Sequence, residues 1–98
     1  MRKKPKIVFI GGVKHKVFSS DEISGPRRRG MRILGQYRPI SGEILYKTRL
    51  GVEKNITITH EILHAVDHQF DIGLPEITVD IISREIVGAM SQLGMLRH

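Results

Sequence analysis

The sequence predicts one α+β domain, in which two short antiparallel β-hairpins form a small sheet and two packed helices follow. Three observations favour this class. The chain has 98 residues, which is enough for one hydrophobic core. Short runs rich in β-branched residues, interrupted by glycine and proline, fill its first half. Apolar residues recur at helical spacing in its second half. We therefore expect a single domain over residues 1–98, with flexible ends at 1–5 and 95–98.

Four strands are predicted in the first half of the chain. Their expected ranges are 6–10, 13–18, 31–37 and 43–47. Gly11 and Gly12 join the first two strands, and glycine adopts the positive φ of a tight hairpin turn freely. Pro39 and Gly42 mark the turn between the last two strands. The polar segment from Ser19 to Gly30 is expected to be an exposed loop between the two hairpins.

Two helices are predicted in the second half. The first is expected from about Val52 to Phe70, although Asn55 to Thr59 has poor helix propensity and needs tertiary packing to hold it. The apolar stripe expected on its buried face consists of Ile62, Leu63, Val66 and Phe70. Asp71 to Leu74 breaks this helix, and Pro75 suits the start of the next one. In the second helix, helical spacing relates Ile82, Ile86, Ala89 and Leu93, and Gly94 suits its end.

Charge is distributed unevenly along the chain, whose formal net charge is +6. Residues 1–58 hold 14 Lys/Arg and 4 Asp/Glu, giving +10, whereas residues 59–98 hold 2 and 6, giving −4. The basic half indicates either a solvated surface or an anionic partner such as nucleic acid. The strongest candidates for nucleic-acid contacts are Arg27, Arg28 and Arg29. The acidic half carries four of the five histidines, which favours a divalent cation.

Targeting signals are not apparent in the sequence. Cysteine is absent, which excludes disulfides and is consistent with a reducing compartment. No stretch approaches the roughly 18 apolar residues of a membrane span. The apolar run from Ile7 to Ile10 is shorter than the apolar region of about 7–15 residues in a signal peptide. We expect a soluble cytoplasmic protein with no membrane partner.

His60-Glu61-Ile62-Leu63-His64 matches the H-E-x-x-H pattern of zinc sites. Residues four apart lie on the same side of a helix, so His60 and His64 can reach one ion. Glu61 projects at a neighbouring angle, where it can act as acid or base without binding the metal. At about 100° per residue, the expected apolar stripe lies roughly 130° away from the two histidines. The pattern therefore predicts a buried face and a separate histidine face.

A zinc site needs a third protein ligand beside the two histidines. Asp67 and His68 follow on the same helix, but a regular helix places them about 10–12 Å along its axis from His60. We therefore expect the third ligand from the second helix, folded back antiparallel to the first. The candidate carboxylates, in order of preference, are Asp80, Glu76 and Glu85.

The segment from Thr59 to Asp67 resembles the active-site helix of small HExxH zinc metallopeptidase-like proteins of phages and other mobile elements. These proteins are related in pattern to the ImmA/IrrE-type peptidases and the gluzincins. Three further parts of the chain resemble the family: Ile10 to Gly12, the hairpin from Leu34 to Tyr46, and Val79-Asp80 with Ile82. The resemblance implies a minimal zincin-like fold, encoded by a phage or prophage and located in the cytoplasm of the bacterial host.

The resemblance also implies that His60 and His64 bind zinc, that Glu61 is the general acid/base, and that an acidic third ligand follows. In the family this ligand is usually Glu. The best-matching position here is Asp80, and Thr78 stands where related sequences often have Glu.

The predicted activity is hydrolysis of peptide bonds, with Glu61 taking a proton from the water that zinc activates. We expect the substrate to pair with the strand from Glu43 to Lys47. Candidate donors to the substrate or the oxyanion are Tyr46, Tyr37 and His68. The alternative is a binding protein without catalysis, which holds nucleic acid or a host protein and keeps zinc as a structural or vestigial site.

Overall fold

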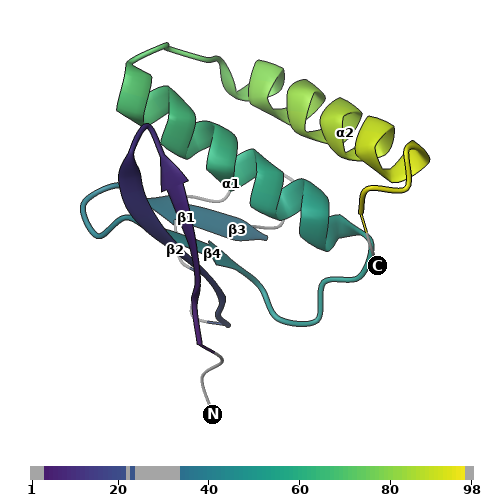
Figure 1. The fold of residues 1–98 in the computed structure, drawn as a ribbon, viewed down its shortest axis with the longest axis horizontal. Helices are drawn as coiled ribbons and strands as arrows, with labels where there is room; N and C mark the ends of the chain where they lie inside the picture. Colours follow the sequence, from purple (N-terminus) through teal and green to yellow (C-terminus); the bar gives the residue numbers. More distant parts are fainter. Residues whose placement is uncertain (1–3, 22, 24–33, 97–98) are drawn as a thin grey trace.

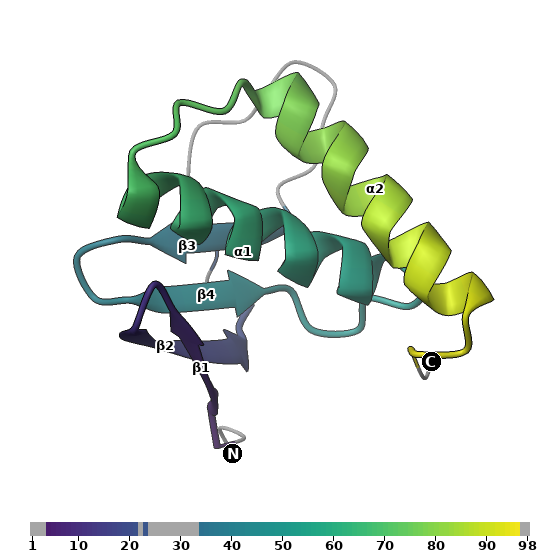
Figure 2. The ribbon, with the colours of Figure 1, turned by 45° about the horizontal axis from the view of Figure 1, so that its top comes forward.

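The computed structural model describes residues 4–21, 23 and 34–96, and the statements below refer to these residues. Four strands precede two helices, which confirms the predicted α+β class. The strands are β1 (Lys6–Ile10), β2 (Val13–Ser19), β3 (Gly35–Arg38) and β4 (Glu43–Tyr46), and the helices are α1 (Glu53–Phe70) and α2 (Glu76–Gln92). Helix α1 lies between the sheet and α2, so the molecule has three layers (Figure 1 and Figure 2).

The four strands form one mixed sheet in the order β1-β2-β4-β3. Both predicted hairpins are present as antiparallel pairs, β1 with β2 and β3 with β4. Gly11 and Gly12, with φ of 58° and 78°, make the turn of the first hairpin. The hairpins join through a parallel pairing of β2 with β4, which the sequence analysis did not predict. The long segment between β2 and β3 allows this parallel pairing, because parallel neighbours need a long connection.

The sheet order decides which strand can pair with an added peptide. Strand β4 already pairs with β2 on one side and with β3 on the other. The expectation that a substrate pairs with Glu43 to Lys47 is therefore wrong, because both edges of this strand are occupied. Strand β3 lies at one edge of the sheet and β1 at the other.

The core lies between α1 and the sheet. Its buried centre consists of Ile10, Ile44 and Ala65, and partly buried Val8, Val17, Tyr37, Ile62 and Val66 pack around it. The most buried residues of α1 are Thr57, Glu61 and Ala65, which recur every four residues on the side that faces the sheet.

The buried face of α1 was predicted only in part. Ile62 and Val66 pack against the core, but Phe70 is 61% exposed. Phe70 lies at the last turn of α1, where its ring contacts the turn of the first hairpin at Gly11 instead of entering the core. Small side chains at Thr57 and Ala65 let the helix approach the sheet closely, and this rotates the buried face toward Glu61.

Helix α2 returns along α1 after a short connection. Asp71 and Gly73 adopt positive φ there, at 49° and 81°, and Pro75 directly precedes α2. The buried stripe of α2 is Val79, Ser83 and Val87, whereas Ile86 and Leu93 of the predicted stripe are 41% and 74% exposed. A helix that packs on a single neighbour buries only a narrow stripe. Neither described helix is long and apolar enough to cross a membrane.

Candidate metal centre

His60 and His64 lie one turn apart on the side of α1 that faces α2. Their ring centroids are 4.8 Å apart, and their two Nε2 atoms approach to 3.1 Å. Both side chains are largely buried, with exposed fractions of 16% and 28%. The predicted pairing of the two imidazoles toward one point is therefore present, in the space between the helices.

Helix α2 contributes two carboxylates to this space from its first two turns. Glu76 spans both histidines, with Oε1 2.7 Å from Nε2 of His60 and Oε2 3.1 Å from Nε2 of His64. Asp80 lies one turn further along, and its Oδ1 is 3.1 Å from Nδ1 of His60. Glu76 thus faces the point that both rings share, whereas Asp80 contacts the opposite edge of one ring.

His60, His64 and Glu76 form a group that could hold a metal ion, since one potential ligand atom from each lies within 4.8 Å of the other two. Asp80 stands behind this group, where it can accept the Nδ1 proton of His60 and so direct Nε2 toward the ion. The geometry therefore favours Glu76 over Asp80 as the third ligand. Glu85, the third candidate, is exposed on α2.

Glu61 occupies the sheet-facing side of α1, beside the histidines. It is 8% exposed, and its Cγ lies 3.0 Å from the position that a Cβ on Gly35 of β3 would take. Burial, followed by the negative charge of Glu76, raises the pKa of this carboxyl from 4.5 to about 7. The charge of Glu76 thus acts on the carboxyl of Glu61, which lies at the border between the helix pair and the edge strand β3.

Asp67 does not join the histidine group, and instead organises the connection to α2. Its Oδ1 accepts the backbone N–H of Gly73 at 2.6 Å and that of Leu74 at 3.2 Å. These bonds fix the turn that begins α2, and hence the approach of Glu76 to the histidines. From the sequence, Asp67 was a candidate only for a metal ligand. The sequence does contain a sign of its structural role. Asp67 is a hydrogen-bond acceptor shortly before the turn at Gly73, where backbone N–H groups lack helical partners.

Tyr37 and His68 line a cavity of about 450 Å³ beside His64, together with Pro39, Asp67, Asp71 and Gly73. Tyr37 projects from β3, and its ring centroid lies 6.0 Å from that of His68. Its hydroxyl is buried and has no hydrogen-bond partner among the described residues, and burial raises its pKa. Tyr46 is not part of this cavity, because its ring lies 5.4 Å below the ammonium group of Lys54.

His15 was not identified from the sequence, although it supports Tyr37. It is 1% exposed, its Nδ1–H donates to the Val13 carbonyl at 2.8 Å, and its ring lies 5.9 Å from that of Tyr37. The alternation of Val13, His15 and Val17 in β2 is the signal that places this histidine on the inner face.

The predicted nucleic-acid contacts Arg27, Arg28 and Arg29 lie outside the described residues. Comparison with known protein families, with curated proteins and with solved structures finds no match to this chain. The chemistry of the site therefore rests on its own geometry.

Proposed function

We propose that the protein is a zinc-dependent metallopeptidase. The observation that carries this proposal is the convergence of His60, His64 and Glu76 on one point, with the buried Glu61 beside them. Ordinary ion pairing between histidines and carboxylates is the alternative explanation of these contacts. It accounts less well for two imidazole Nε2 atoms at 3.1 Å from each other, since both turn the same edge toward one carboxylate.

The donor atoms and their separations suit zinc. Zinc takes imidazole nitrogen and carboxylate oxygen at about 2.0–2.2 Å, and neighbouring ligands of a tetrahedral ion are then about 3.3 Å apart. The two Nε2 atoms are 3.1 Å apart, and one ligand atom from each of the three residues lies within 4.8 Å of the others, so small side-chain movements would bring the group to that size. Three protein ligands leave one position open, which is typical of catalytic zinc sites.

Bound zinc would supply a Lewis acid that polarises a carbonyl and acidifies water. Glu61 is the group of this chain that then takes the proton of water and delivers it to the leaving amine. Its burial restricts exchange of that proton with bulk solvent. Asp80 holds the ring of His60 in one orientation through Nδ1, which keeps Nε2 aimed at the ligand group.

The substrate would add as an extended strand to the edge of β3 that pairs with no other described strand. This strand carries Gly35, which lies against Glu61, and Tyr37, which lines the cavity next to His64. A peptide on this edge therefore passes the acid/base group and the metal ligands in sequence. The hydroxyl of Tyr37 has no hydrogen-bond partner among the described residues and is assigned to the substrate carbonyl.

Metal analysis and a cleavage assay test the proposal together. Purified protein is expected to carry about one zinc per chain, and His60→Ala or His64→Ala should lose it. Glu61→Gln should retain zinc and abolish cleavage of a peptide library, with Glu85→Gln as the matched control that keeps both. Zinc-free wild-type protein in buffers without chelator would contradict the proposal. Zinc binding without cleavage of any peptide would support a binding protein instead.

A further inference from the structure

The sheet has a second face that the helices do not cover. A Cβ on Gly35 would point at α1, and the side chain of Tyr37 in the same strand β3 packs on the core, so Gln36 and Arg38 face away from α1. The strand register carries this alternation across the sheet, because paired residues share a face. The residues that face away from α1 define what we call the outer sheet face: Ile7, Phe9, Lys14, Lys16, Phe18, Gln36, Arg38, Glu43 and Leu45. Leu45 is 2% exposed and Oε1 of Gln36 is buried, so the exposed part of this face lies over β1 and the start of β2.

The exposed part of the outer sheet face places cations beside large apolar side chains. Phe9 pairs with Lys14 across β1 and β2, and Ile7 pairs with Lys16. Phe9 is 66% exposed and Ile7 is 46% exposed, while both lysines are exposed. Ile7 and Phe9 lie two residues apart on β1, so they form a small exposed apolar patch beside the two lysines.

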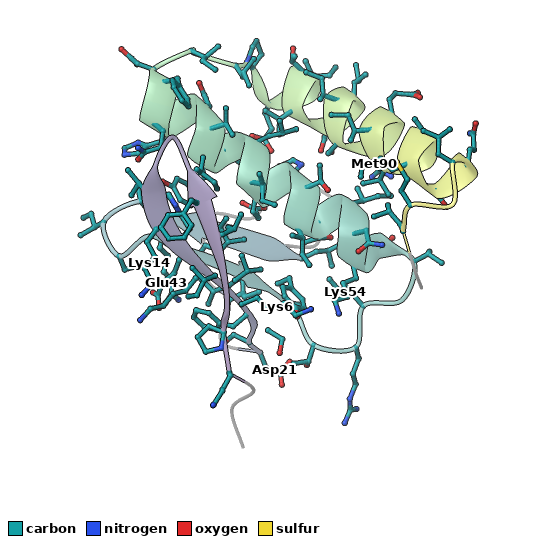
Figure 3. All side chains as sticks on the ribbon, in the orientation of Figure 1. Lys6, Lys14, Asp21, Glu43, Lys54 and Met90 are labelled. Carbon is teal, nitrogen blue, oxygen red and sulfur yellow. The ribbon has the colours of Figure 1, made fainter. Side chains whose placement is uncertain are left out.

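The electrostatic balance of this face is positive. The acidic side chain of the same face is Glu43, which lies 3.7 Å from Arg38 and accepts the hydroxyl of Ser41 at 2.8 Å. Figure 3 shows Glu43 and Lys14 near each other on the side of the strands opposite to α1 and α2. Among the described residues, neither Lys14 nor Lys16 forms an ion pair. Two ammonium groups therefore remain available to an anionic partner, about 7 Å apart along β2.

We propose that the outer sheet face binds single-stranded nucleic acid. Lysines two residues apart on one strand suit successive phosphates of an extended chain, and an exposed ring beside them provides a stacking surface for a base. The exposed Lys14, Lys16 and Phe9 match this ligand, since every base has a π-face and no groove is required. An anionic membrane fits less well, because the exposed apolar side chains of this face are limited to Ile7 and Phe9, which Lys14 and Lys16 flank.

This inference is independent of the proposed peptidase, since it uses other residues on the other face of the sheet. It also differs from the expectation drawn from the sequence, because the contacts it names lie on β1 and β2. If both proposals hold, a peptidase would be held at nucleic acid while its zinc site on the opposite face stays accessible.

Fluorescence anisotropy with labelled oligo(dT) and oligo(U) of about 20 nucleotides tests the inference across a series of salt concentrations. Wild-type protein should bind at least one of them at low salt, and affinity should fall steeply as salt rises. Lys14→Ala/Lys16→Ala should weaken binding at least about tenfold and reduce the log–log salt slope by about 1.4, at about 0.7 per lost phosphate contact. The matched control Lys54→Ala/Arg84→Ala removes the same charge from α1 and α2, and should change affinity less than about threefold.

Phe9→Ala separates stacking from charge. It should weaken binding at least about fivefold and leave the salt slope unchanged, and circular dichroism verifies that the fold is intact. Absence of saturable binding to both oligonucleotides at low salt would overturn the inference. An equal loss of affinity in the control variant, or unchanged binding by Phe9→Ala, would also overturn it. Displacement of the oligonucleotide by phosphatidylserine vesicles, with vesicle binding that depends on Phe9, would overturn it in favour of a membrane.

Discussion

The burial of Glu61 predicts a distinctive pH dependence of stability in the zinc-free protein. Burial and the charge of Glu76 raise the pKa of this carboxyl from 4.5 to about 7. The folded state therefore holds the proton more tightly than the unfolded chain does. The stabilisation is complete below a pH of about 4.5 and is lost as the pH rises through about 7.

The size of the loss follows from the two pKa values. At about 1.4 kcal/mol per pKa unit, their difference corresponds to about 3 kcal/mol by pH 9. Glu61→Gln keeps the shape of the side chain and carries no charge. The variant should therefore exceed wild type in unfolding free energy by about 3 kcal/mol at pH 9, with a rise in Tm on the order of 10 °C, and should match it closely near pH 4.

Thermal and urea unfolding in EDTA at several pH values between about 4 and 9 measures this difference. Glu85→Gln is the matched control, because it removes the same charge from an exposed position and should follow wild type at every pH. Parallel loss of stability by wild type and Glu61→Gln as the pH rises would refute the reasoning, since the carboxyl would then not be buried in the folded protein.

Substitutions at five further residues test the packing of the helices and the contacts around the site. Gly35→Ala should destabilise the fold by about 1–3 kcal/mol, because its Cβ would lie 2.7 and 3.0 Å from two side-chain atoms of α1. Gly88→Ala, in open space on α2, should stabilise it by about 0.5–1 kcal/mol, and urea unfolding measures both. Asp67→Ala removes the acceptor of two backbone N–H groups, and should lower stability by about 1–3 kcal/mol and weaken zinc binding. Asp67→Asn keeps an acceptor oxygen and should recover most of both properties. Unchanged stability of the alanine variant would contradict this role. In competition with a chelator, Asp80→Ala should weaken zinc binding about 10–100-fold and Glu76→Ala more strongly, and the reverse order would make Asp80 the ligand.

The sequence predicted the elements of this fold better than their mutual arrangement. Strands and helices follow from local patterns, and even the β-branched segment from Asn55 to Thr59 is helical, as expected. The parallel pairing of β2 with β4 depends on contacts between distant segments, which local periodicity does not encode. The buried face of α1 depends on how closely Gly35 lets the helix approach β3, and this also is a tertiary effect.

The candidate site shows the same division. The spacing of His60 and His64 follows from helix geometry, and the structure brings them together. Glu76 and Asp80 lie one turn apart on one side of α2, so the pattern alone could not choose between them. The choice depends on where the turn held by Asp67 begins α2, and this turn places Glu76 opposite both Nε2 atoms.

Anomalous diffraction from crystals of the zinc-loaded protein would locate the ion. We expect a single zinc peak between α1 and α2, at about 2.0–2.2 Å from Nε2 of His60, Nε2 of His64 and one carboxylate oxygen of Glu76, with Asp80 retained on Nδ1 of His60. A peak bound by His68 with Asp67 or Asp71, or no peak beside the two histidines, would contradict it.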